Sequence, residues 1–167
     1  TSQASGTGAA PYRFITYADR LYLEAELINT GVIAGDAKAV LAAAMAASFA
    51  QVDYVISTYV KPNQTVPLLM GANGATPTAA VTTYINGVLA VYDAGTTAKK
   101  LEVIMTQKWL SAFGCAVDSY TDYRRTGYPI LFDPRDPAMA PGGRAQPPLT
   151  GNPILNGLGQ TQPNVPV

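Results

Sequence analysis

Apolar residues recur at every third or fourth position along most of the first 126 residues, and this spacing predicts amphipathic helices. The pattern covers about residues 15–29, 36–58, 77–94, 97–113 and 115–126. Glycines that follow several of these stretches are typical of helix C-termini. The sequence therefore predicts an all-α fold.

The first two stretches are expected to form an antiparallel helical hairpin, because only a short link with glycines joins them. The second stretch carries six alanines between residues 42 and 50, and alanine both favours helix and lets a partner backbone approach closely. The third and fourth stretches are expected to form a second hairpin. Stacked hairpins of this size are similar to tetratricopeptide-like repeats, although no strict period of about 34 residues is present.

The same spacing predicts which residues form the core. In the first helix the predicted buried face consists of Phe14, Tyr17, Ala18, Leu21, Ala25 and Ile28. In the fourth helix it consists of Leu101, Ile104, Met105, Trp109, Ala112 and Phe113. We expect these side chains to lie between the helices.

The two ends of the chain carry no helical period. Residues 1–13 are expected to form an extended leader, and residues 14–127 the helical region. Nine of the thirteen prolines lie in residues 128–167, where no charge follows Arg144. This low-charge composition differs from that of ordinary disorder, so we expect an irregular tail packed on the helical body.

No membrane-spanning helix is expected. Residues 39–52 form an uncharged run, but a span needs about 20 apolar residues. Residues 62–92 are also uncharged, but prolines and glycines interrupt them. The sequence also starts without the basic and apolar regions of a signal peptide.

Charge and composition exclude several kinds of chemistry. Eleven Lys and Arg balance eleven Asp and Glu, so the net charge of +0 argues against nucleic acid as a partner. The chain contains no histidine, which excludes His-based catalysis and His-ligated metals. Cys115 is its one cysteine, so an internal disulfide and a Cys-only metal site are excluded. We expect no cofactor and no metal.

The best candidates for catalysis are Asp118 and Asp122, which are four residues apart on one helix face. Two such carboxylates form the acid–base pair of glycoside hydrolases when they lie about 5–10 Å apart in a pocket. Arg125 lies three residues beyond Asp122 and can neutralise it, so a structural ion pair is the favoured interpretation. A pocket with both carboxylates unpaired would reverse that preference.

The ten tyrosines offer a different chemistry, because an exposed aromatic ring can stack on the apolar face of a sugar while its hydroxyl forms hydrogen bonds. Most of them lie on predicted core faces. Tyr59 stands instead at the start of the long loop over residues 60–76, and it is our candidate ligand-binding residue. No catalytic residue is assigned.

Three segments together resemble the C-terminal region of the SusD/RagB-like nutrient-binding lipoproteins of Bacteroidetes. They are residues 15–26 (ITYADRLYLEAE), residues 101–110 (LEVIMTQKWL) and residues 118–129 (DSYTDYRRTGYP). The resemblance extends from about Phe14 to Tyr128 with the segments in the family's order. The family's usual Glu-Ala-Trp is replaced by Asp118-Ser119-Tyr120, and Cys115 is not a usual family residue.

The resemblance implies a surface-exposed outer-membrane lipoprotein with a tetratricopeptide-like scaffold. Such proteins are not enzymes. They bind glycans or other nutrients and deliver them to a TonB-dependent SusC-like transporter. Family members are longer, so the resemblance implies that an N-terminal part, with its lipid-bearing cysteine, belongs to the same protein. The family's ligand residues vary, so none is transferred to this chain.

Two other functions stay open. The chain can be a helical-repeat scaffold for protein–protein interaction, in which case the concave face of the hairpins is the site. A small glycoside hydrolase that uses Asp118 and Asp122 is the less favoured alternative.

Overall fold

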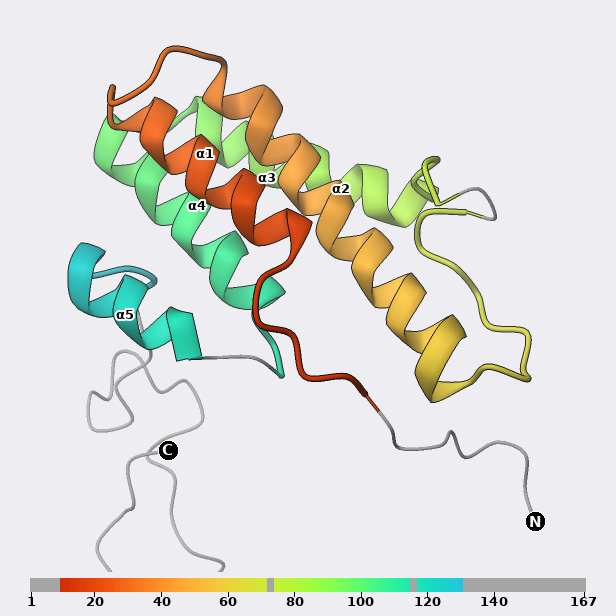
Figure 1. Cartoon of the computed structure of the whole chain (residues 1–167). Coiled ribbons are helices and arrows are strands. Elements are labelled where there is room, and N and C mark those ends of the chain that lie inside the picture. Colours follow the sequence, from red (N-terminus) through yellow and green to blue (C-terminus); the bar gives the residue numbers. More distant parts are fainter. Residues whose placement is uncertain (1–9, 72–73, 115–116, 131–167) are drawn as a thin grey trace, which may run out of the picture. The chain divides into compact units, whose positions relative to one another are not determined.

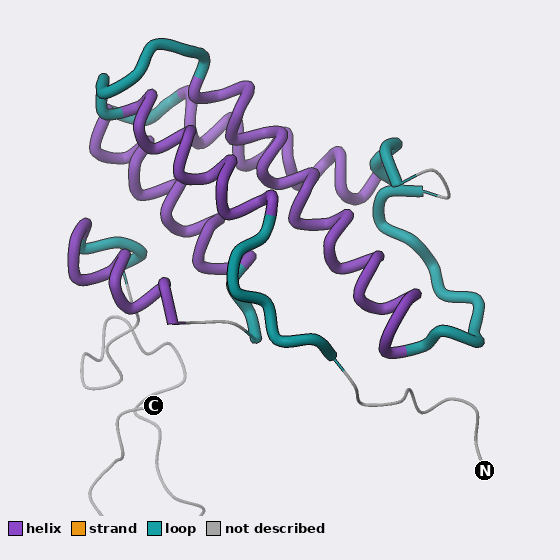
Figure 2. The backbone as a smooth tube through the Cα atoms, viewed as in Figure 1, coloured by secondary structure: helices purple, strands orange, loops and turns teal. Residues whose placement is uncertain are grey.

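The computed structural model describes residues 10–71, 74–114 and 117–130 (Figure 1). Within them the chain forms α1 (Tyr17–Asn29), α2 (Ala37–Val55), a π-helical turn η1 (Ile56–Val60), α3 (Ala79–Asp93), α4 (Thr97–Ser111) and α5 (Val117–Thr126). Those residues contain no strand (Figure 2), and the predicted all-α fold is confirmed. Cys115, most of the leader and most of the tail lie outside the described residues.

The helices belong to one compact unit, which ends at Pro129. α1 and α2 lie antiparallel and pack along each other (Figure 1). α4 packs more extensively against α1 than against α3, its neighbour in the sequence. α3 packs against both α2 and α4. The arrangement is therefore a bundle around α1 and α2 rather than two independent hairpins.

Side-chain caps determine where the helices begin. Thr16 caps α1 through a capping box, in which its hydroxyl accepts from the Asp19 amide while the Asp19 carboxylate accepts from Thr16. Thr78 caps α3 by accepting from the Val81 amide, so α3 begins at Ala79. The helix thus begins two residues later than the stretch over about residues 77–94 predicted.

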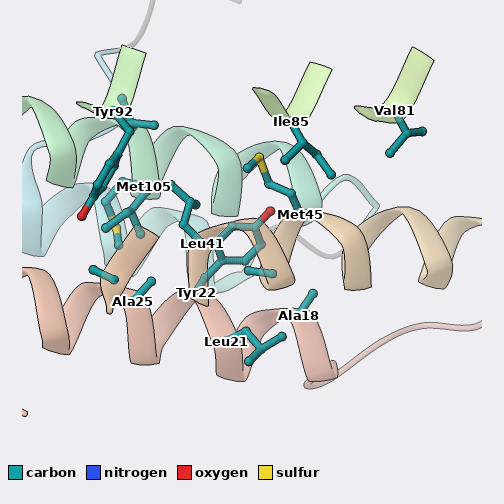
Figure 3. Packing of buried hydrophobic residues seen from close by; sticks show 14 of the residues in the cluster. Ala18, Leu21, Tyr22, Ala25, Leu41, Met45, Val81, Ile85, Tyr92 and Met105 are labelled. Atoms are coloured by element: carbon teal, nitrogen blue, oxygen red, sulfur yellow. The ribbon is translucent and has the colours of Figure 1, made fainter. Parts of the chain in front are cut away.

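The core lies where α1, α2, α3 and α4 meet (Figure 3). α1 contributes Leu21 and Tyr22, and Ala25 and Ala44 are fully buried between the helices. α2 adds Leu41 and Met45, which the close approach of alanine-rich surfaces brings against α1. The buried side chains are Ala18, Leu21, Tyr22, Ala25, Ala37, Leu41, Ala44, Met45, Met70, Val81, Ile85, Tyr92, Val103, Ile104 and Met105.

Four residues that were predicted to be buried are exposed. Phe14 precedes the first turn of α1 and Phe113 follows the last turn of α4, and their exposed fractions are 84% and 90%. Tyr17 and Trp109 lie near the same helix ends, and they are also exposed. In these two helices the periodicity was correct for the middle and failed near the ends.

The helical run Ala37–Val60 is long and apolar enough to cross a membrane by length and composition alone, with a mean hydropathy of 1.6. Core helices meet the same criterion. In this run 22% of the most apolar 18-residue window is buried, but α2 packs against α1, α3 and α4, and Asp53 accepts two hydrogen bonds from backbone amides. We therefore interpret α2 as the central helix of the bundle.

Candidate functional site

Tyr59 lies beside Tyr54 at the C-terminal end of α2. The two ring centroids are 5.8 Å apart at an interplanar angle of 83°, and the hydroxyl oxygens are 3.3 Å apart. The exposed fractions are 53% for Tyr54 and 39% for Tyr59. We call these two residues the tyrosine pair. It presents two aromatic rings and two hydroxyls at the surface, which is the chemistry that the sequence suggested for Tyr59 alone.

The π-helical turn η1 contains Tyr59 and follows directly after the last turn of α2, which contains Tyr54. A π-helix is wider than an α-helix, so residues five apart lie closer to one side of it. The Lys61 amide donates to the Ile56 carbonyl at 2.7 Å, a five-residue step, and the Ser57 hydroxyl donates to the Asp53 carbonyl at 2.7 Å. The hydrogen bond with Tyr54 raises the pKa of the Tyr59 phenol above its usual value.

The loop after η1 is attached to α2 by Asp53. The carboxylate accepts from the Leu69 amide at 2.9 Å and from the Met70 amide at 2.7 Å, and Met70 is buried in the core. Sequence reasoning missed Asp53. A signal was present, because Asp53 is the only charged residue between Lys38 and Lys61 and such a residue on an apolar helix needs partners.

A second feature is an apolar trough between α2, α3 and α4. Two cavities of about 450 and 410 Å³ share four lining residues, Ser48, Val52, Leu110 and Ser111, and so form one continuous depression. Within it, the Tyr84 hydroxyl donates to Gln107 Oε1 at 2.7 Å. The remaining lining residues are Ala10, Pro11, Tyr12, Arg13, Tyr22, Met45, Phe49, Val55, Ile56, Leu69, Ala80, Val81, Phe113 and Gly114.

The trough has almost no charge. Arg13 is the one charged residue among the described residues that line it, and its guanidinium donates to the Phe113 carbonyl. Leu110 and Val52 are partly exposed, and Phe113 is almost fully exposed. The trough therefore presents apolar side chains to solvent.

Charged residues of α1, α4 and α5 form a third feature, which we call the charged joint and define as Glu26, Lys108, Asp122 and Arg125. Arg125 forms a two-pronged ion pair with Glu26, in which one nitrogen–oxygen distance is 2.9 Å. Arg125 also lies 3.0 Å from Asp122, and Lys108 Nζ is 2.6 Å from the other Asp122 oxygen. The hydrogen bond to Glu26 raises the pKa of Arg125 further above its usual value.

The charged joint removes the support for a glycoside hydrolase. Asp122 is paired with two cations, and the alternative required that neither carboxylate be paired with arginine. Asp118 and Asp122 do line a common cavity, but its volume of about 20 Å³ holds roughly one water molecule. Elsewhere in the described ranges, no three His, Cys, Asp or Glu side chains lie close enough to hold a metal ion.

Comparison with known families identifies the chain. A family model described as SusD-like, the Susd and RagB outer membrane lipoproteins, matches residues 1–146. The chain belongs to the SusD-like family. Neither a curated protein nor a solved structure matched it.

The SusD-like segments recognised in the sequence are the three helices that the charged joint connects. Residues 15–26 end at Glu26 in α1, residues 101–110 include Lys108 in α4, and residues 118–129 carry Asp122 and Arg125 in α5. Each segment thus contributes at least one charged side chain to a single network. These segments hold the fold together, and the candidate ligand chemistry lies elsewhere, at the tyrosine pair.

Proposed function

We propose that this SusD-like chain takes part in binding a nutrient, a glycan or oligosaccharide, at the surface of the bacterial outer membrane. The observation that carries the proposal is the exposed tyrosine pair at the end of α2. Membership of an outer-membrane lipoprotein family supports the location. The protein delivers its ligand to a TonB-dependent SusC-like transporter, and a lipid on an N-terminal cysteine outside this sequence anchors it.

The tyrosine pair suits a neutral sugar for two physical reasons. The edge-to-face geometry of the rings leaves exposed aromatic surface on which the apolar face of a sugar ring can lie. The two hydroxyls, 3.3 Å apart, can each exchange their mutual hydrogen bond for one to a sugar hydroxyl. Such binding requires no metal and no catalytic group.

The test is binding of a glycan array by the full-length protein, followed by titration calorimetry with the glycan that binds best. Tyr59→Ala is expected to weaken that binding several-fold, because the stacking surface is lost. Tyr120→Ala is the matched control, since Tyr120 is also an exposed tyrosine but lies on α5. Unchanged affinity in Tyr59→Ala, with normal folding, removes the tyrosine pair as the site.

The apolar trough favours a second candidate function, in which the bundle is a scaffold for another polypeptide. A photo-crosslinking amino acid in place of Leu110 tests it in cells, with the same group in place of Tyr59 for comparison. Crosslinks from position 110 to a second protein, identified by mass spectrometry, support the scaffold. Crosslinks to glycan from position 59 alone support nutrient binding.

A further inference from the structure

Asp53 is a buried charged residue on a mostly apolar helix. Its exposed fraction is 8%, yet both carboxylate oxygens accept hydrogen bonds, Oδ1 from the Leu69 amide and Oδ2 from the Met70 amide. Its own backbone carbonyl accepts from the Ser57 hydroxyl within η1. Asp53 is thus bonded to both the π-helical turn and the far end of the loop.

These bonds close residues 54–68 into a loop with Asp53 at its base. The tyrosine pair lies at the start of this loop. No residue of η1 is buried, and the residues from 61 to 69 are exposed or only partly buried. Met70 is the first residue after α2 that enters the core. The loop is therefore attached to the bundle chiefly at its end, where Asp53 holds it.

We propose that Asp53 is the positioning residue of the tyrosine pair: its carboxylate holds the end of the loop against α2 and so keeps Tyr59 beside Tyr54. The part of the proposal that concerns ligand rests on the proposed function. Asp53 itself is buried and does not contact the ligand. Asp53 orders the binding surface before the ligand arrives, so the entropy cost of ordering this surface does not weaken binding.

The first test needs no ligand and uses hydrogen exchange of the unaltered protein. The Leu69 and Met70 amides are expected to exchange at least about tenfold more slowly than the Thr65 and Val66 amides of the same loop, because they donate to a buried carboxylate. Equal exchange rates for the four amides overturn the proposal. This measurement does not depend on whether any variant folds.

Asp53→Asn gives the second test. An asparagine side chain has one acceptor oxygen, and its amide group meets the other backbone amide as donor against donor. Exchange at Leu69 or Met70 is expected to accelerate about tenfold or more. With ¹³C-labelled tyrosine rings, the pKa of Tyr59 is expected to fall toward its usual value as the pair separates. Unchanged exchange and an unchanged Tyr59 titration overturn the proposal.

Asp36→Asn is the matched control. Asp36 lies at the other end of α2, where its carboxylate accepts from the Ala39 amide as the N-cap, and asparagine caps helices equally well. This variant makes the same chemical change on the same helix. It is expected to leave the exchange of Leu69 and Met70 and the Tyr59 titration unchanged.

Ligand binding then separates the two proposals. The probe is the array glycan that binds the unaltered protein best, and Asp53→Asn is expected to weaken it several-fold. The positioning role is overturned if Asp53→Asn accelerates exchange at the Leu69 and Met70 amides but leaves the affinity for the glycan unchanged. If the unaltered protein binds no glycan, the proposed function fails, and the exchange and titration results still decide whether Asp53 holds the tyrosine pair.

Discussion

The charged joint and the apolar trough meet at α4, which carries Lys108 of the joint and Leu110 of the trough, and the two surfaces of the bundle differ in chemistry. At the charged joint, α5 is a polar helix with little apolar area to bury, and ion pairs attach it to α1 and α4. At the trough, α2, α3 and α4 carry apolar side chains that no other described helix covers. The charged side chains of the joint are paired with one another, whereas the apolar side chains of the trough are not covered by a described helix.

We infer that ion pairs attach a helix firmly only where the paired charges are removed from solvent. Glu26 is 4% exposed, and Lys108 and Asp122 are mostly buried, so breaking these pairs leaves a charge without solvent. The exposed side chains of the trough, Val52, Leu110 and Phe113, are in the opposite position. They are already in contact with water, so their removal costs the isolated chain little, and their function depends on what binds there.

The largest expected effect comes from breaking the charged joint. Arg125→Ala leaves the Glu26 carboxylate buried without its cation, and we expect the free energy of unfolding to fall by about 3 kcal/mol. The Arg125 side chain is itself about half exposed, which places the expectation at the low end of the range for buried pairs. Urea denaturation monitored by circular dichroism measures it.

A double-mutant cycle sharpens that prediction. Glu26→Gln combined with Arg125→Ala is expected to be less destabilised than the two single changes together, since the uncompensated charge is then absent. Strict additivity of the two changes would show that the ion pair is not what holds α5.

The second effect is a pH dependence of the free energy of unfolding that comes from Tyr22. The ring of this residue is buried at the junction of the core and the trough. Burial raises the pKa of the Tyr22 phenol well above its usual value of 10.0. The stabilisation that comes from the neutral Tyr22 phenol is therefore fully present below about pH 10. It falls by about 1.4 kcal/mol per pH unit above that, because the unfolded phenol ionises while the folded one stays neutral.

Denaturation midpoints between pH 9 and 11 check this expectation against Tyr22→Phe. The variant lacks the ionisable group, so its stability is expected to decline less steeply over the same range. Parallel curves for the two proteins contradict the assignment.

The third effect concerns the open surface of the trough. Leu110→Ser is expected to lower the free energy of unfolding by under about 1 kcal/mol, because nearly half of the side chain is already exposed. Met45→Ala, at a residue that also lines the trough but is 1% exposed, is expected to cost about 3 kcal/mol. Thermal denaturation of the two variants compares them, and equal losses would mean that the trough surface is covered within the chain.

The smallest effect is expected at a surface ion pair. Lys38 Nζ lies 2.6 Å from Asp93 Oδ2, as close as Lys108 lies to Asp122, but both side chains are about half exposed. Lys38→Ala is expected to change stability by a few tenths of a kcal/mol at most. A loss as large as that of Arg125→Ala would show that distance, rather than desolvation, decides the strength of these pairs.

Much of this architecture was predictable from the sequence because helix formation is local. The apolar period located the five helices, and the residues that cap α2 and α4, Asp36 and Thr96, are of the types that favour this position. The family resemblance was also visible, because it lies in short contiguous segments. The candidate Tyr59 followed from its place at the start of a loop, and the structure added Tyr54 as its partner.

What the sequence alone determined is therefore the helices, their caps and the family. Only the tertiary structure decided that Glu26 meets Arg125, 99 residues away, that Asp53 holds the amide of Met70, and that Phe113 faces outward. A helical period reports which residues share a face. It does not report where a neighbouring helix ends or which charge lies opposite a carboxylate, since both depend on how separate helices pack.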